Sequence, residues 1–86
     1  MLKARFREEY IALKECLVEE RTKAGMKQAD LAQALGVRQS LISDIETGQR
    51  RCDVVELIAI AHALGRDPAE LIARVEQAFP RGRASK

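Results

Sequence analysis

The sequence predicts an all-α protein, a compact bundle of five helices in one domain. Helix-forming residues dominate, whereas aromatic residues make up only 3% of the chain and Trp is absent, so residues that favour strands are scarce. Apolar residues recur at steps of three and four, the spacing of one helix face, and glycines separate these stretches. Because 86 residues suffice for a single hydrophobic core, we expect one domain.

The first two helices are indicated by apolar stripes that end at glycine. The stripe of the first helix is Leu2, Phe6, Tyr10, Leu13 and Leu17. Gly25 supplies a left-handed stop after it. The second helix is shorter, starts at Gln28 and closes at Gly36. Its apolar face is Leu31, Ala32 and Leu35.

The third helix follows directly, and the fourth begins with its own capping residue. Leu41, Ile42 and Ile45 mark the third helix. It ends at residues 47–48, and residues 49–52 form a loop. Asp53, with Glu56 three residues later, is a capping box that starts the fourth helix. The apolar face of that helix is Val54, Leu57, Ile58, Ala61 and Leu64.

The fifth helix closes the domain. It starts at Asp67, has Pro68 in its first turn, and stops before Pro80. It buries Leu71, Ile72 and Val75. We therefore expect the domain, with its extended first helix, to span residues 1–79, and residues 80–86, which are basic and have nothing to bury, to form a disordered tail.

Composition excludes several classes of protein. No apolar run reaches the ~18 residues of a membrane span, and the N-terminus lacks the apolar segment of a signal peptide, so we expect a cytoplasmic protein. Cys16 and Cys52 are far apart and are interpreted as small apolar residues in a reducing compartment. With His62 as the single histidine, we expect no metal site, no cofactor, no small-molecule ligand and no enzymatic activity.

Residues 28–47 have the pattern of a helix-turn-helix. Ala32 is small where the two helices approach, Gly36 can adopt a positive φ in the turn, and Val37 is expected to plug the corner. The residues that face the common core are Leu31, Leu35, Ile42 and Ile45. The second helix of such a motif can enter a DNA major groove, although helical hairpins with a glycine turn also occur as plain structure.

Three segments strengthen the DNA-binding interpretation: residues 24–32 (AGMKQADLA), residues 42–48 (ISDIETG) and residues 61–68 (AHALGRDP). Through them the chain resembles, over residues 13–72, the Cro/repressor-type helix-turn-helix family, also called the xenobiotic-response-element family of transcriptional regulators. The resemblance implies a five-helix, lambda-repressor-like domain that binds operator DNA, usually as a dimer, with its third helix in the major groove.

Arg21 and Glu46 are expected to form a structural ion pair. Arg21 lies four residues after Leu17, and Glu46 lies four residues after Ile42, so each charge extends an inward-facing stripe. A buried lone charge would cost several kcal/mol, which favours pairing over two independent surface charges. The resemblance implies the same pair.

The helix starts differ in a way that suggests phosphate binding. Asp53 and Asp67 can cap the fourth and fifth helices, whereas the second and third begin at Lys27-Gln28 and Arg38-Gln39 without a Ser, Thr, Asp or Asn at the cap. An uncapped N-terminus offers free N–H groups and partial positive charge to a phosphate. DNA phosphates could therefore cap both helices. Alternatively, water or a neighbouring carbonyl fills in, since the family more often has Thr or Ser there.

The outward side of the third helix carries the candidate base readers, Gln39, Ser40, Ser43 and Asp44. The amide of Gln39 can pair with adenine N6 and N7, and the hydroxyls can donate or accept at several bases. Asp44 could accept from cytosine, but a solvated or Arg-paired carboxylate is the favoured interpretation. The candidate phosphate-binding residues are Lys27, Gln28, Arg38, Gln49, Arg50 and Arg51.

These features predict a sequence-specific DNA-binding regulator, a repressor or autoregulator, that binds an inverted repeat in double-stranded DNA as a homodimer. The candidate dimer residues are Leu2, Phe6, Ile11, Ile72, Val75 and Phe79. The alternative is a protein-interaction adaptor or antitoxin that uses the same fold without reading bases. The net charge of only +2 means that any basic surface must be local.

Overall fold

The computed structural model describes residues 4–80 and consists there of helices and their connections, with no strand. A short 3-10 helix, η1 (Ala4–Phe6), precedes the α-helices. These are α1 (Arg7–Lys23), α2 (Gln28–Leu35), α3 (Gln39–Thr47), α4 (Val54–Ala63) and α5 (Pro68–Glu76). The predicted all-α class and its five helices are confirmed. Of the predicted basic tail, residues 81–86 lie outside the described residues.

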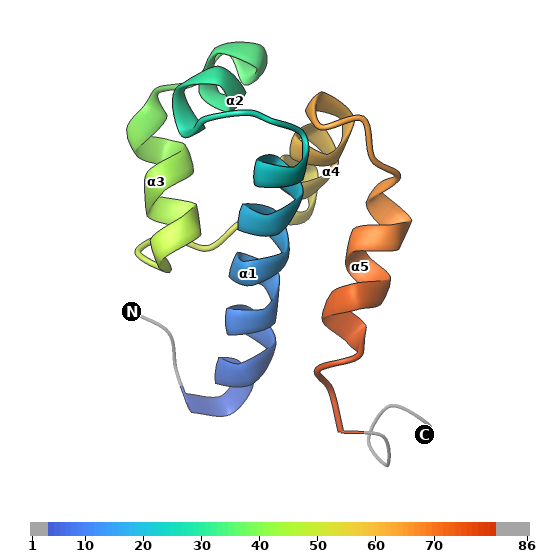
Figure 1. Ribbon diagram of the computed structural model, residues 1–86. Coiled ribbons are helices and arrows are strands. Elements are labelled where there is room, and N and C mark those ends of the chain that lie inside the picture. The colour runs from blue at the N-terminus through green and yellow to red at the C-terminus, as the bar shows by residue number, and fades with distance from the viewer. Residues whose placement is uncertain (1–3, 81–86) are drawn as a thin grey trace.

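The long helix α1 occupies the middle of the bundle, with α2 and α3 on one side and α5 on the other (Figure 1). It packs against α3 and α5, while α4 packs against α2 and α5. The helix-turn-helix is therefore held from two directions, by α1 behind α3 and by α4 behind α2.

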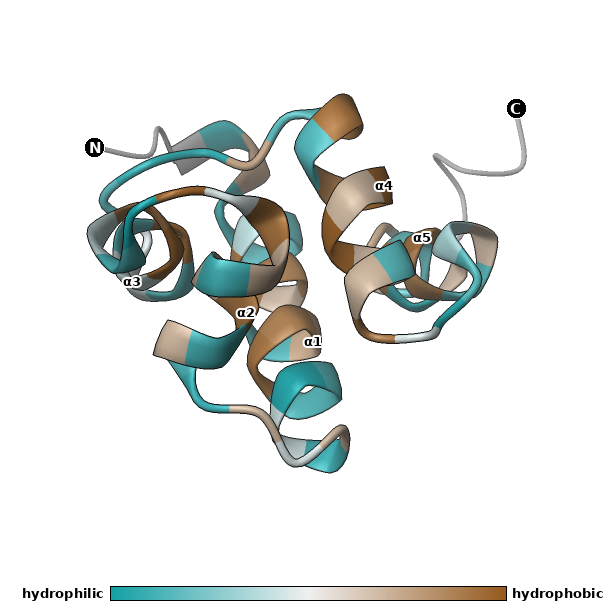
Figure 2. Cartoon of the chain, turned by 90° about the horizontal axis from the view of Figure 1, so that it is seen from above, coloured by the Kyte–Doolittle hydropathy of each residue, from teal (hydrophilic) through white to brown (hydrophobic). Residues whose placement is uncertain are grey.

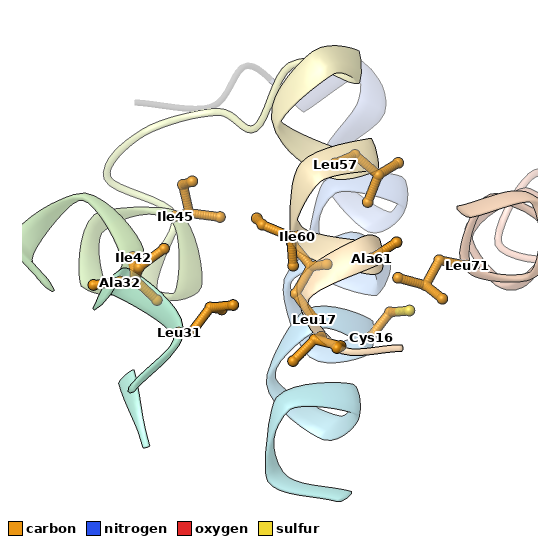
Figure 3. Packing of buried hydrophobic residues seen from close by; sticks show 11 residues of the cluster. Cys16, Leu17, Leu31, Ala32, Ile42, Ile45, Leu57, Ile60, Ala61 and Leu71 are labelled. Carbon is orange, nitrogen blue, oxygen red and sulfur yellow. The ribbon is translucent and has the colours of Figure 1, made fainter. Parts of the chain in front are cut away.

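One hydrophobic core joins all five helices. Its members are Cys16, Leu17, Leu31, Ala32, Ile42, Ile45, Leu57, Ile60, Ala61, Leu64 and Leu71. Figure 3 shows Leu71 of α5 pointing toward Cys16 of α1 and Ala61 of α4. Leu71 and Ala61 are both 0% exposed, so this junction is fully closed and fixes α5 against the rest of the bundle.

The buried face of α4 differs from the predicted one. Val54 and Ile58 are 65% and 38% exposed, whereas Ile60, which lies outside the predicted stripe, is buried. The reason is visible in Figure 2, where α4 is hydrophobic over most of its length. When nearly every position is apolar, periodicity does not select a face. The prediction that α5 buries Ile72 is also wrong, since Ile72 is 47% exposed.

The beginning of the first helix also departs from the predicted stripe. Leu2 lies outside the described residues, and Phe6 is 39% exposed. The ring of Phe6 lies 6.2 Å from that of Phe79, centroid to centroid. Because the chain is a 3-10 helix up to Phe6, the α-helical period does not extend back through this residue.

A cluster of charges ties α1 to α5. The side chain of Glu20 is only 3% exposed and accepts hydrogen bonds from Arg66 and from Arg74, the latter with Nη1 2.9 Å from Oε2. Arg74 also donates to Glu19 over 2.6 Å. Burial alone would raise the pKa of Glu20, but the hydrogen bond from Arg66 and the surrounding positive charges lower it below its ordinary value. Arg66 and Arg74 thus compensate the charge of the buried Glu20 carboxylate, which would be costly to bury without a partner.

Candidate nucleic-acid interface

The turn between α2 and α3 is built on Gly36. Its φ is +72°, in the left-handed region where a side chain is strained. The N–H groups of Gly36 and Val37 donate to the carbonyls of Gln33 and Ala32, over 3.2 and 3.0 Å, and close the end of α2. Val37 is 36% exposed, so the expectation that it plugs the corner is wrong. It lies at the rim of the turn, where the N-terminus of α3 begins.

The outward face of α3 is polar and open. Gln39, Ser40 and Asp44 are exposed, and Ser43 is half-buried. Ile42 and Ile45 on the opposite face are buried. Within residues 4–80 the carboxylate of Asp44 makes no ion pair, which leaves it solvated rather than Arg-paired. The four candidate base readers therefore share one side of a helix that lies at the edge of the bundle (Figure 1).

The expected pair of Arg21 and Glu46 is present and joins α1 to α3. Arg21 Nε donates to Glu46 Oε2 over 2.7 Å, and Nη2 donates to Oε1 over 3.0 Å. Arg21 Nη1 also donates to the carbonyl of Met26 over 2.7 Å. The two side chains are 14% and 6% exposed. The hydrogen bond to Glu46 raises the pKa of the Arg21 guanidinium despite its partial burial, so the guanidinium stays charged at any physiological pH.

Two glutamines extend this pair to the surface, a connection that the sequence pattern does not predict. Gln28 Nε2 donates to Glu46 Oε1 over 2.9 Å. Gln39 Nε2 in turn faces Gln28 Oε1 at 3.4 Å. Gln28, expected only as a phosphate-binding residue, is half-buried and lies between the ion pair and the best candidate base reader.

The helix N-termini differ as the sequence indicates, with one addition at α2. Asp53 accepts from the N–H of Glu56 over 2.8 Å at α4, and Asp67 accepts from the N–H of Ala69 over 3.0 Å at α5. No side chain caps α3. At α2 the carboxylate of Asp30 accepts from the backbone N–H of Lys27 over 2.8 Å. The N-terminus of α3 is therefore the more open of the two proposed phosphate sites, because a negative charge already lies in the first turn of α2.

The candidate phosphate-binding residues at the helix ends divide into those that are exposed and those that contact another side chain. Lys27 and Arg38 are exposed beside the starts of α2 and α3, and Gln49 is exposed after α3. Arg50 is engaged by Glu56, with Nη1 2.8 Å from Oε1 and Nη2 2.6 Å from Oε2.

Arg50 and Arg51, in the loop after α3, both contact other side chains. The bond from Arg50 to Glu56 raises the pKa of the guanidinium. Arg51 lies over the ring of Tyr10, with its guanidinium carbon 4.9 Å from the centroid. Both side chains therefore contact other parts of the protein close to the C-terminal end of α3.

A second, apolar surface lies where α1, α4 and α5 meet. A groove there is lined by Leu13, Cys52, Asp53, Val54, Leu57, Ile72, Val75, Glu76 and Phe79. Three of the candidate dimer residues, Ile72, Val75 and Phe79, are among them, whereas Ile11 is half-buried outside the groove. Val54, which lines the groove, and the next residue, Val55, are 65% and 74% exposed, and neither is among the residues predicted for the dimer interface.

The cysteines are free thiols in the described structure. Cys16 is buried in the core, and burial raises the pKa of its thiol. Burial raises the pKa of Cys52 to about 12. Across residues 4–80 no group of His, Cys, Asp or Glu side chains is arranged to hold a metal ion, and none of the helices there is long and apolar enough to cross a membrane.

A three-residue turn, a second helix with an open polar face, and basic side chains at its flanks together define a helix-turn-helix DNA-binding domain. A helix-turn-helix family model matches residues 17–71, and the chain belongs to this family, the Cro/repressor type. It is a DNA-binding transcriptional regulator.

Two solved structures have the same fold. The first is an XRE-family like protein from Pseudomonas syringae pv. tomato str. DC3000, with 38% identity over 86% of this chain and 90% of that one, and a TM-score of 0.80. The second is the clp gene regulator ClgR from C. glutamicum, with 25% identity over 85% of this chain and 95% of that one, and a TM-score of 0.74. No curated protein matches the sequence.

Proposed function

We propose that this regulator is a repressor or autoregulator that reads an inverted-repeat operator as a homodimer. The observation that carries the proposal is the outward face of α3, where exposed polar side chains begin at an uncapped helix N-terminus beside Arg38. In a DNA duplex, the base edges can bind the polar side chains of α3, and the phosphates can bind the free N–H groups at its N-terminus.

The base contacts fall to the exposed side of α3. Gln39, at the first position of the helix, pairs through its amide with adenine N6 and N7. Ser40 and Ser43 contact neighbouring base edges, and the solvated carboxylate of Asp44 accepts from a cytosine amino group. The negative charge of Asp44 also repels phosphates. Asp44 therefore disfavours duplexes that do not place a cytosine amino group opposite its carboxylate.

The phosphate contacts lie on both flanks of α3. Lys27 and Arg38 donate at the starts of α2 and α3, and Gln49 and Arg51 donate after α3. Gln28 uses one amide hydrogen for Glu46 and keeps the second for a phosphate. Arg50 contributes positive charge at the same edge, although its guanidinium is held by Glu56 and reaches a phosphate only if that pair opens.

The homodimer follows from the size of the reading surface, because one α3 contacts only a few base pairs and an inverted repeat requires two-fold symmetry. The apolar groove, which Val54 lines, and the exposed Val55 next to it in sequence support an interface on this side of the domain, since such a surface is costly to leave in water. Half-site centres then lie about 34 Å apart, or a multiple of that distance.

The experiment is a selection of bound duplexes from a random pool, followed by salt titration of the affinity for the enriched site. We expect a palindrome, and a log–log slope of about −0.9 for each phosphate neutralised. Arg38→Ala should reduce the slope by about one and weaken binding to all sequences alike. Gln39→Ala should instead abolish preference at one base pair of each half-site. Equally weak binding to every duplex would reject operator reading and favour the adaptor or antitoxin function.

A further inference from the structure

We propose that Glu20 is a positioning residue that fixes the orientation of α5 against α1 and thereby sets the spacing of operator half-sites that the homodimer accepts. The inference rests on the proposed function, in which two copies meet through the apolar groove. It deepens that function, because it assigns spacing selectivity to a buried carboxylate that lies neither in the groove nor on α3.

The apolar contacts of α5 leave its orientation open. Among the residues of α5, only Leu71 is buried, and it points toward Cys16 of α1 and Ala61 of α4 (Figure 3). The following apolar side chains, Ile72 and Val75, are exposed and half-buried, and they line the groove. A helix that is fixed at one point can pivot about that point. Leu71 therefore attaches α5 to the bundle without setting its tilt.

The Glu20 carboxylate opposes such a pivot from both sides of Leu71. Arg66, which precedes α5, donates to Oε1 of Glu20, and Arg74, in the last turn of α5, donates to Oε2 over 2.9 Å. A tilt that moves the C-terminal end of α5 away from α1 would break the bond from Arg74. A tilt in the opposite direction would break the bond from Arg66. The two bonds together hold one orientation of the helix, and we call them the α5 lock.

Water does not easily replace these two bonds, because Glu20 lies inside the contact between the helices. Its side chain is 3% exposed, whereas those of Arg66 and Arg74 are 32% and 37% exposed. A buried carboxylate that loses its guanidinium partners is left with an uncompensated charge. The outer bonds of the cluster, from Arg66 to Glu70 and from Arg74 to Glu19, end at carboxylates that are 61% exposed, so water can substitute there. Glu20 is therefore the residue on which the orientation of α5 depends most.

The orientation of α5 affects DNA binding through the dimer. Ile72 and Val75 line the groove, so a change in tilt moves the surface that a second copy contacts. Because the Arg21–Glu46 pair fixes α3 to α1, the position of α3 relative to the interface follows the angle between α1 and α5. Two rigidly connected reading helices fit one half-site spacing, since each added base pair separates the half-sites by about 3.4 Å and rotates one of them by about 35°.

The test compares affinities for inverted repeats whose half-sites are separated by spacers that differ by one base pair. The native protein should prefer one spacer. Glu20→Gln keeps the shape of the side chain, but its NH₂ group no longer accepts from an arginine. We expect the ratio of affinities for the native spacer and its neighbours to fall by about 5-fold or more. Base preference within a half-site should stay unchanged, and an unchanged spacing ratio would overturn the α5 lock.

A second substitution tests whether the two bonds act as one unit. Arg74→Met removes one side of the α5 lock and should lower the spacing ratio as Glu20→Gln does. Because both changes disable the same restraint, the double variant should lose no more than either single variant. Fully additive losses would show that Glu20 and Arg74 act separately and would contradict the proposal.

Two controls separate the orientation of α5 from charge and from stability. Glu70→Gln makes the same chemical change at an exposed carboxylate of the same cluster and leaves both bonds to Glu20 in place. Ile60→Val lowers stability in the core on α4, at a residue that does not line the groove. Both controls should keep the native spacing ratio. A fall in either one equal to that of Glu20→Gln would show that spacing selectivity follows net charge or stability, and would overturn the α5 lock.

A measurement without DNA tests the α5 lock directly. Spin labels attached at Ser40→Cys, near the start of α3 in each copy, report the distance between the two reading helices by pulsed electron paramagnetic resonance. Burial raises the pKa of both native thiols, so the introduced, exposed thiol reacts first. We expect a narrow distance distribution that widens in Glu20→Gln but not in Glu70→Gln. Equal widths in all three proteins would contradict the proposal.

The failure of the α5 lock is distinguishable from the failure of the proposed function. If Ile72→Asp gives a monomer that no longer distinguishes spacers, while Glu20→Gln keeps the native ratio, the groove is the dimer interface and only the α5 lock is wrong. If the native protein binds a single half-site as tightly as every inverted repeat, operator reading by a homodimer is wrong, and the α5 lock is wrong as well.

Discussion

Replacing Glu46 by Met should destabilise the fold strongly, because the carboxylate accepts three hydrogen bonds at the junction of α1, α2 and α3. Two come from Arg21 and one from Gln28, with lengths between 2.7 and 3.0 Å. Without Glu46, the Arg21 guanidinium, whose side chain is 14% exposed, keeps the Met26 carbonyl as its only partner among residues 4–80.

The magnitude follows from the partial burial of the pair. A hydrogen bond to a charged group contributes about 1.5–3 kcal/mol, and removing one member of a fully buried pair costs about 3–5 kcal/mol. Because Arg21 retains some contact with water, we expect a loss of about 2–3 kcal/mol. For a domain of this size, that corresponds to a fall in melting temperature of roughly 10–20 °C.

The assay is thermal unfolding followed by circular dichroism at neutral pH, for Glu46→Met, Arg21→Met and the double variant. The double variant should be more stable than either single one, because no charge is left unpaired. Arg50→Met is the control, since the Arg50–Glu56 pair is 40% and 25% exposed and its loss should cost much less. A shift below ~1 °C for Glu46→Met, or additive losses in the double variant, would refute the reasoning.

Three further outcomes are expected. The lowered pKa of Glu20 means that its stabilisation is present above the ordinary Glu pKa and disappears as the pH falls through the lower folded value. The melting temperatures of the native protein and Glu20→Gln should therefore converge only well below the ordinary Glu pKa of about 4.3. Because burial raises the pKa of both thiols, Cys16 and Cys52 should react with iodoacetamide far more slowly at mildly alkaline pH in the native than in the unfolded protein. Ile72→Asp, at a 47% exposed position, should shift sedimentation toward the monomer with unchanged helical content, whereas an unchanged sedimentation coefficient would place the dimer interface elsewhere.

The elements that the sequence predicts well are those with local causes. The caps at Asp53 and Asp67 depend on residues two or three positions away, and the buried face of α3 stands out because polar residues separate Ile42 from Ile45. In α4 the polar residues are too few to mark the solvent side, and the choice between Ile58 and Ile60 depends on how α2 and α5 pack against it. Periodicity carries no information about that packing.

The polar contacts of the site divide in the same way. Arg21 and Glu46 can be paired because each extends an apolar stripe. The same signal exists for Glu20, four residues after the buried Cys16, and identifies it as an inward-facing carboxylate. Its partners Arg66 and Arg74 are 46 and 54 residues away, so only the tertiary structure reveals them. The bond between Gln28 and Glu46 likewise depends on how α2 crosses α3.

Glu20 and Glu46 position two different helices against the same support, α1. Glu46 holds α3 to α1, and Glu20 holds α5 to α1. In a homodimer formed through the apolar groove, the distance between the two reading helices is set by the path from α3 through α1 to α5. A loosened Glu20 cluster therefore alters the half-site spacing that the dimer tolerates and leaves base preference intact, because the hydrogen bonds of Glu46 with Arg21 and Gln28 do not involve α5. A loosened Glu46 pair acts on both properties, since it anchors α3, the helix that carries the candidate base readers.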